Sequence, residues 1–213
     1  MATTLTAENQ IFEPVAWETV PCPFCGSTKA SLYENFGHKL KFSYIRCAAC
    51  TLVYQSPRPQ YDDKFVNTAY EVYVTEDKNE FFDGNGLLPG GERLMIKSTK
   101  MLKEIEAFVP NKGRILDIGC HIGLFCHTAN TRGWKATGVD ISSTMVEIAK
   151  KRFDVDARQG DWTQMKFENK FDAICCDHVL EHIPNPGAWL KLMRDTITPK
   201  GVICISVPNV DSI

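Results

Sequence analysis

Four of the nine cysteines form two short pairs whose spacing is typical of a metal site. Cys22 and Cys25 enclose two residues, and Cys47 and Cys50 repeat that spacing after a gap of 21 residues. One tight turn of this length directs two thiolates to one ion, and a second turn completes a tetrahedral site. We predict a structural zinc ion, because four thiolates leave no open position for a catalytic water. Two redox-active pairs or two disulfides are the alternative.

The sequence around these cysteines predicts a small zinc ribbon. Gly26 and Ser27 supply turn residues, and residues 31–47 contain two strand-like runs that turn near Gly37 and His38. A module of this size buries little apolar surface, so metal binding would contribute its folding free energy. The remaining cysteines lie in apolar stretches and are interpreted as core residues: Cys120, Cys126, Cys175, Cys176 and Cys204.

A second group of residues indicates a ligand loop at positions 117–123, Asp-Ile-Gly-Cys-His-Ile-Gly. Its glycines allow a tight turn and close approach of the backbone to a ligand, and the following helix offers free N–H groups. A dinucleotide-binding loop would need glycine at 119, 121 and 124, but the chain has Gly119, His121 and Leu124. Asp117 is better suited to a cationic amino group than to a pyrophosphate. This pattern disfavours an NAD-dependent oxidoreductase.

Two later segments carry side chains suited to a nucleoside. The carboxylate of Asp140 can accept both hydroxyl protons of a ribose, and Ile141 beside it can lie on an adenine face. Asp161, between Gly160 and Trp162, can accept a hydrogen bond from the exocyclic amine of adenine, and the indole of Trp162 can pack against the adenine ring.

The elements that must position these residues alternate between strands and helices. Amphipathic spacing predicts a helix from Glu92 to Val109, ended by Pro110. Strands are predicted at 114–119, 135–140, 155–159, 171–176 and 201–207, with helices from about 122, over 143–152 and near 186–196. This alternation predicts a doubly wound, mostly parallel α/β sheet, in which ligands bind beyond the carboxyl ends of the strands.

Composition and boundaries complete the expectations. The 213 residues have a net charge of -2, no basic region typical of nucleic-acid binding, and no apolar stretch of signal-peptide or membrane-span length. We therefore expect a cytoplasmic protein without membrane or nucleic-acid partners. Prolines 57 and 59 suggest three parts: a zinc-ribbon module (1–58), a linker with N-terminal helices and a possible tyrosine lid (59–110), and a core (111–213).

The ordered segments ILDIGCHIGLF, GVDIS, QGDW and FDAICCDHVLEHIPNPGAWLKLMRDTITPKGVICISVPN resemble the motifs of class I S-adenosylmethionine-dependent methyltransferases over about residues 90–210. The resemblance implies a Rossmann-like core and S-adenosylmethionine as cofactor. By resemblance, the methionine part is held by Asp117 and the backbone of Gly119, Cys120, His121 and Gly123; the ribose by Asp140; the adenine by Ile141, Gly160, Asp161 and Trp162; and the sulfonium lies beside Asp177 and His178. His121 departs from the small residue usual in the family. The chain also ends before the family's last strands, so we expect a core truncated at its C-terminus.

The resemblance extends to the acceptor. Bacterial methyltransferases of sugar, polysaccharide and natural-product pathways often carry an N-terminal four-cysteine zinc module, which implies a small-molecule acceptor. An RNA base methyltransferase is the second hypothesis, although residues 1–60 hold five Lys and Arg against four Asp and Glu, too few for tracking phosphates. A hypothesis of a different class is a cofactor-binding protein that has no activity as truncated, and an NAD-dependent oxidoreductase ranks third among the enzymes.

Methyl transfer to a hydroxyl also needs a base. The candidates are His178 and the adjacent Glu181 and His182, which follow the fourth predicted strand. In some small-molecule methyltransferases that this segment resembles, the Glu-His pair contacts the acceptor. The alternative for His182 is to cap or pack the short helix that leads to Pro184.

Overall fold

The protein is described by a computed structural model that covers residues 16–36, 42–60, 87 and 89–209. The chain divides into two compact units, residues 1–75 and 76–213. The predicted turn at Gly37 and the proposed lid tyrosines Tyr61, Tyr70 and Tyr73 lie outside the described residues. Within the described residues, no helix is long and apolar enough to cross a bilayer.

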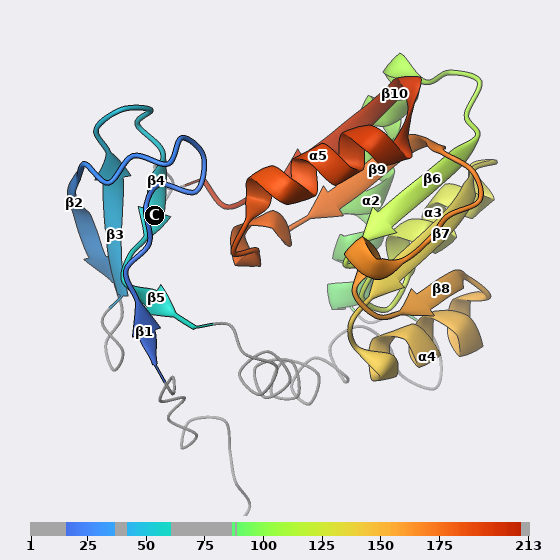
Figure 1. Ribbon diagram of the computed structural model, residues 1–213. Helices are drawn as coiled ribbons and strands as arrows, with labels where there is room; N and C mark the ends of the chain where they lie inside the picture. The colour runs from blue at the N-terminus through green and yellow to red at the C-terminus, as the bar shows by residue number, and fades with distance from the viewer. Residues whose placement is uncertain (1–15, 37–41, 61–86, 88, 210–213) are drawn as a thin grey trace, which may run out of the picture. The chain divides into compact units, whose positions relative to one another are not determined.

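The first unit consists of small antiparallel sheets (Figure 1). Strands β2 (Ala30–Phe36), β3 (Phe42–Cys47) and β4 (Val53–Gln55) form one sheet, and β1 (Trp17–Glu18) pairs with β5 (Arg58–Pro59). Among the described residues, its buried apolar cluster consists of Cys22, Cys47 and Tyr54, on which the partly buried Val20, Ile45 and Cys50 pack. A core of this size contributes little hydrophobic stabilisation.

The second unit contains a five-stranded, entirely parallel sheet. Its strands are β6 (Arg114–Ile118), β7 (Lys135–Asp140), β8 (Asp156–Gln159), β9 (Phe171–Asp177) and β10 (Ile197–Ser206). The spatial order is β10-β9-β6-β7-β8, so the order reverses between β6 and β9. This confirms the predicted doubly wound α/β architecture, in which a ligand crevice is expected at that switch point.

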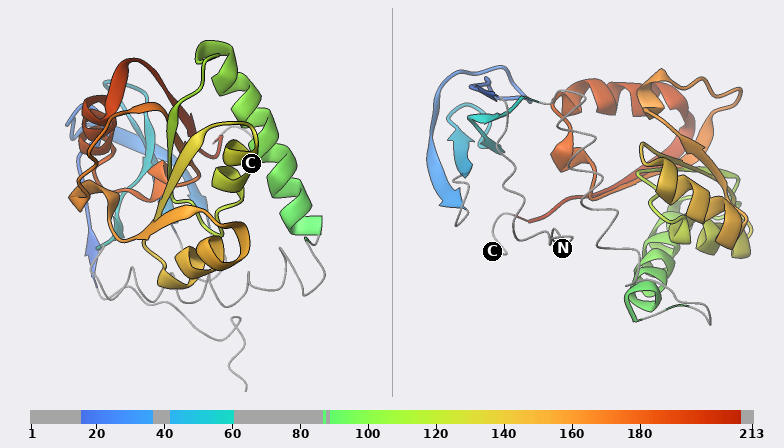
Figure 2. Two further views of the ribbon diagram at one scale, coloured as in Figure 1. Left: turned by 90° about the vertical axis from the view of Figure 1, so that its right-hand side faces the viewer. Right: turned by 90° about the horizontal axis from the view of Figure 1, so that it is seen from below.

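Helices cover both faces of the sheet (Figure 2). One face packs against α2 (Pro89–Phe108), α3 (Leu124–Thr131) and α4 (Ser143–Phe153), and the other against α5 (Pro186–Thr196) and the short 3-10 turn η2 (Trp162–Gln164). A second 3-10 turn, η3 (Leu180–His182), follows β9. Local signals set the helix starts: the Ser142 hydroxyl accepts from the backbone N–H of Met145, and Asn185 caps α5 just before Pro186.

Strand β6 is buried on both faces of the sheet, and this packing holds the carboxyl end of the strand in one position. Ile115 belongs to the cluster under α2 and α3, whereas Leu116 and Ile118 belong to the cluster under α5. Because successive side chains of a strand point to opposite faces, a central parallel strand is apolar throughout. Asp117 breaks this rule, and its burial at the strand end therefore needs a functional explanation.

Glu106 fastens α2 to the end of α3. Its carboxylate accepts hydrogen bonds from Arg132 Nε (3.0 Å) and Nη2 and from Trp134 Nε1 (3.2 Å). The hydrogen bond from Arg132 holds the pKa of Glu106 below its usual range. This network keeps α2 against the sheet and so positions the side chains of α2 that reach the strand ends.

We expect Glu106→Ala to lower the free energy of unfolding by about 2–3 kcal/mol, because it leaves the Arg132 and Trp134 donors without their acceptor. Urea unfolding measures the loss. Glu147→Ala is the matched control: among the described residues the ion pair of Glu147 is with the exposed Lys151, so this variant should show no measurable change. Equal losses in the two variants would show that the network does not fasten α2.

Candidate functional site

In the loop after β6, two positions have no room for a side chain. Gly119, His121 and Gly123 all adopt left-handed conformations, with φ of 77°, 50° and 80°. A Cβ at Gly119 would lie 2.3 Å from Val179 Cγ2, and one at Gly123 would lie 2.7 Å from Ala149 Cβ. Both glycines are therefore required by close packing as well as by φ.

His121 takes the left-handed conformation although it is not glycine. Its backbone N–H donates to Asp140 Oδ2 at 2.8 Å, which ties the loop after β6 to the end of β7. The buried Cys120 precedes it, and the N–H groups of Gly119 and Cys120 both donate to the carbonyl of Val139. The predicted loop and the predicted ribose-binding carboxylate are thus brought together.

Asp140 is 6% exposed at the carboxyl end of β7. Burial raises the pKa of Asp140, and the hydrogen bonds from the Ser142 and His121 N–H groups oppose that rise. Gly160, at the end of β8, donates its N–H to the Asp140 carbonyl at 2.9 Å, so the ends of β7 and β8 are adjacent. Ile141 follows Asp140 and is partly buried, as a residue lining a ligand would be.

Asp117 is a buried carboxylate among other acids. Its side chain is 4% exposed, and the Cys126 thiol donates to its Oδ2 at 3.7 Å. Burial first, and then the charges of Asp177 and Asp140, raise the pKa of Asp117 to about 7. A ligand with a positive charge would relieve this repulsion, so the carboxylate cluster fits a cationic group.

Asp177 ends β9 and pairs with a residue that the sequence interpretation missed. Lys97 Nζ of α2 lies 2.6 Å from Asp177 Oδ2. The other oxygen, Oδ1, is buried and has no hydrogen-bond partner among the described residues, which suits a cationic ligand. The available signal was a lysine between Leu94 and Met101, on the face of the predicted helix that turns toward the core.

The residues after β8 lie partly in the core. Both carboxylate oxygens of Asp161 accept from Thr163, from its N–H at 2.9 Å and its hydroxyl at 2.7 Å. Trp162 is 3% exposed and packs edge-on against Trp189, with ring centroids 5.3 Å apart. Its Nε1 is buried without a partner among the described residues. A role for Asp161 and Trp162 in adenine binding stays a prediction.

The segment after β9 carries the three candidate bases. His178 has a φ of 54°, and its N–H donates to the carbonyl of Ser206 at the end of β10 (2.9 Å). Its Nδ1 lies 3.2 Å from Glu181 Oε1. His182 is exposed, and its side chain has no hydrogen bond or ion pair with the described residues. The sequence places Glu181 beside His182, but the structure pairs Glu181 with His178.

In the first unit the four paired cysteines converge. The Sγ atoms of Cys22 and Cys50 are 3.5 Å apart, as are those of Cys25 and Cys47, and all four lie within 4.8 Å of one another. Four thiolates around one tetrahedral zinc ion, each about 2.3 Å from it, would be about 3.8 Å apart. The cluster therefore fits a single zinc ion. Hydrogen bonds from the backbone N–H groups of Cys50 and Ala49 lower the pKa of Cys47 to about 6, whereas burial and the neighbouring thiols raise the pKa of Cys50 to about 12.

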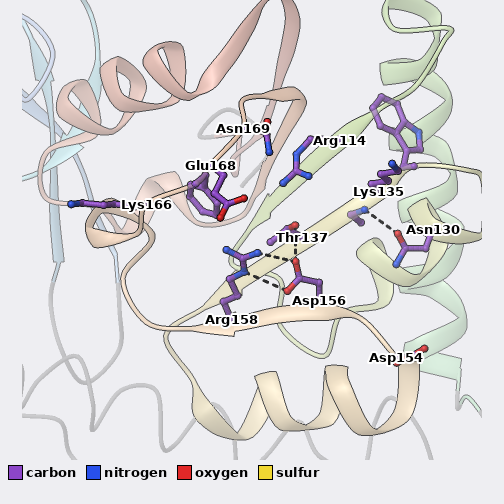
Figure 3. A pocket seen from close by; sticks show the side chains of 13 residues that line it. Arg114, Asn130, Lys135, Thr137, Asp154, Asp156, Arg158, Lys166, Glu168 and Asn169 are labelled. Atoms are coloured by element: carbon purple, nitrogen blue, oxygen red, sulfur yellow. Dashed lines mark hydrogen bonds and ion pairs between the residues drawn. The ribbon is translucent and has the colours of Figure 1, made fainter.

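A hollow of about 710 Å³ lies at the end of the sheet opposite to the motifs, and Figure 3 shows the side chains that line it. It is lined from the amino ends of β6, β7 and β8, and none of the predicted site residues lines it. Asp156, one of its acids, is already paired with Arg158 (3.1 Å) and accepts from the Thr137 hydroxyl (3.0 Å). The candidate site is therefore the cluster at the carboxyl ends of the strands.

Comparison with known proteins identifies relatives of the second unit. A family of methyltransferase domains matches residues 94–213. The ubiquinone biosynthesis O-methyltransferase of Dechloromonas aromatica (strain RCB) is 30% identical over 103 residues, which cover 45% of this chain and 44% of that protein. The corresponding enzyme of Coxiella burnetii (strain Dugway 5J108-111) is 31% identical over 115 residues, covering 51% and 49%. The chain thus spans about half the length of these curated relatives.

Solved structures show the same fold. The S-adenosylmethionine-bound amino pentose methyltransferase of Micromonospora echinaspora, involved in calicheamicin biosynthesis, aligns with a TM-score of 0.51 and 21% identity over 71% of this chain and 59% of that chain. At this identity the likeness concerns the fold: a parallel sheet with helices on both faces.

Proposed function

This chain belongs to the family of methyltransferase domains, and from that premise we propose that it transfers a methyl group from S-adenosylmethionine to a small-molecule acceptor. One observation carries the proposal: the carboxylates of Asp117, Asp140 and Asp177 gather at the carboxyl ends of β6, β7 and β9, around the glycine loop. A cluster of acids beside a loop with a close-packed backbone suits a cationic nucleoside better than a phosphate-bearing one.

Each residue has a definite task in this proposal. Asp117 binds the ammonium of the methionine part, and the glycine loop lets the backbone approach it. Asp140, held in place by the N–H groups of His121 and Ser142, accepts hydrogen bonds from the ribose hydroxyls. Asp177 faces the sulfonium with its unpartnered Oδ1. The cofactor, when bound, supplies an electrophilic methyl group, and the protein aligns the acceptor with it.

Two features support a small-molecule acceptor over RNA. The curated relatives act in ubiquinone biosynthesis, and the structural relative is an amino pentose methyltransferase. In addition, the near-neutral charge of residues 1–60 provides little attraction for a phosphate backbone. We also propose that the four cysteines of the first unit hold one structural zinc ion, and that the protein acts in the reducing cytoplasm, where such thiols stay free to bind metal.

The cofactor assignment is tested by calorimetry. We expect S-adenosylmethionine and S-adenosylhomocysteine each to bind at one site and NAD not to bind. Asp140→Asn should weaken binding about tenfold or more, because the amide replaces one acceptor of the ribose hydroxyls with a donor. Asp154→Asn, in the exposed turn after α4, is the control that should leave affinity unchanged. NAD binding without either sulfur compound would overturn the proposal.

A further inference from the structure

We propose that His178 and Glu181 form a catalytic dyad that takes the proton from a hydroxyl group of the acceptor, which makes the reaction an O-methylation. The inference rests on the proposed methyl transfer and deepens it by naming the acceptor group. The observation that carries it is the contact between His178 Nδ1 and Glu181 Oε1 at 3.2 Å, at the carboxyl end of β9.

His178, directly after the carboxyl end of β9, has an unusual backbone conformation. Its φ of 54° is uncommon for a residue other than glycine, and such conformations concentrate at ligand sites. The N–H of His178 donates to the Ser206 carbonyl at 2.9 Å, so the residue is anchored to the end of β10 as well as to β9. The imidazole therefore projects from a rigid point directly after Asp177.

Glu181 determines which nitrogen of the imidazole can act as a base. A carboxylate accepts but does not donate, so Nδ1 must carry the proton that lies between it and Oε1. The lone pair then belongs to Nε2, the nitrogen turned away from Glu181. The His178 side chain is 48% exposed and that of Glu181 is 22% exposed, so an acceptor can reach the imidazole while the carboxylate stays behind it.

The chemistry balances without a further reactant. The acceptor oxygen forms a bond to the methyl carbon while its O–H bond breaks, and the proton moves to Nε2 of His178. The methyl–sulfur bond breaks with its electron pair on sulfur, which leaves a methyl ether and a thioether. Glu181 stabilises the resulting imidazolium. A neutral amine attacks with its own lone pair, so a positioned base is of use mainly to a hydroxyl.

His182 does not have this arrangement. It is exposed, and no described residue accepts from or donates to its side chain, so within the described part of the chain no contact sets its tautomer. Asp177, next to His178 in the chain, is paired with Lys97 and is not available to orient an imidazole through Oδ2. The pairing of His178 with Glu181 is thus the arrangement that resembles a base with its orienting group.

The first test reads the tautomer directly. Long-range 1H–15N spectra of the full chain with S-adenosylhomocysteine are expected to show His178 protonated on Nδ1 and unprotonated on Nε2. In Glu181→Ala the population should shift toward the Nε2-protonated form, whereas Glu181→Gln, whose amide oxygen can still accept, should retain the wild-type tautomer. Glu147→Ala, which removes an exposed carboxylate elsewhere, is the control. An Nε2-protonated His178 in the wild-type protein overturns the dyad.

The second test measures turnover with a catechol as hydroxyl probe and 1,2-diaminobenzene as the matched amine. His178→Ala is expected to lower kcat for the catechol about 10²- to 10⁴-fold with KM nearly unchanged. Glu181→Ala should lower kcat less, and Glu181→Gln should recover part of that loss. Unchanged kcat in His178→Ala overturns the inference, as does faster methylation of the diamine. If neither probe is methylated, the test of the dyad is the tautomer of His178 alone: protonation on Nε2 overturns the inference.

Calorimetry separates the two proposals. The Glu181 variants should bind S-adenosylhomocysteine with wild-type affinity, because Glu181 contacts the imidazole of His178 and has no proposed part in binding the cofactor. If the wild-type protein fails to bind this compound, the proposed methyl transfer is wrong. If it binds but His178 has the other tautomer, only the dyad is wrong.

Discussion

Removing zinc with a chelator is expected to unfold residues 16–60 while the parallel sheet stays folded. In the described part of the first unit the buried apolar cluster is Cys22, Cys47 and Tyr54, and two of these three are predicted metal ligands. Structural zinc in small domains contributes about 10–16 kcal/mol of apparent binding free energy, more than such a core can replace. Loss of the β2–β3 amide signals in two-dimensional NMR spectra measures the effect, together with elemental analysis that finds one zinc per chain before chelation.

A single substitution should reproduce this result. We expect Cys47→Ser to release the zinc and the same set of amide signals to collapse, because three thiolates and a hydroxyl hold zinc far more weakly than four thiolates do. Cys204→Ser is the matched control: it also removes one cysteine, but from the edge strand of the sheet. A zinc-free protein in which β2, β3 and β4 remain folded would show that the cysteine cluster is not a structural metal site.

The elements that sequence reasoning predicted well are those in which local pattern and tertiary role agree. Ile115, Leu116 and Ile118 pack on both faces of a central strand, and they flank Asp117, one of the three carboxylates of the site. The two Cys-x-x-Cys turns needed no knowledge of the fold either, since each brings its sulfurs together through local geometry and the two turns meet. In both cases a local pattern identifies the residues, although the two cysteine pairs meet only because β2 pairs with β3.

Other features depend on distances that no local pattern contains. Lys97 lies 80 positions before Asp177 in the chain, and only the packing of α2 on the sheet brings the two together. Glu181 is adjacent to His182 in sequence, yet the 3-10 turn η3 and the left-handed backbone of His178 direct it to the histidine three residues earlier. Trp162 follows a strand end as a ligand-lining residue would, but its ring packs in the core against Trp189.

Asp117→Asn is expected to weaken binding of S-adenosylhomocysteine about 100-fold or more and to abolish the pH dependence of binding. In the cofactor-free protein burial and, to a smaller extent, the charges of Asp177 and Asp140 raise the pKa of Asp117 to about 7, although hydrogen bonds from Cys126 and Cys175 oppose the rise. The ammonium of the ligand needs the ionised carboxylate. Below pH 7 binding must therefore release a proton, and the affinity should fall as the pH falls from 8 to 6, measured by calorimetry.

The stability of the cofactor-free protein should show the opposite trend with pH. The pKa of Asp117 is higher in the folded state than its ordinary value of 3.8, so the folded state binds more protons between that value and about 7. Stability from this group is present at low pH and is lost as the pH rises through that window. Asp117→Asn should thus stabilise the cofactor-free protein at pH 8 while it weakens binding. A variant that loses affinity and stability together would show instead that Asp117 holds the fold, with no specific part in binding the ligand.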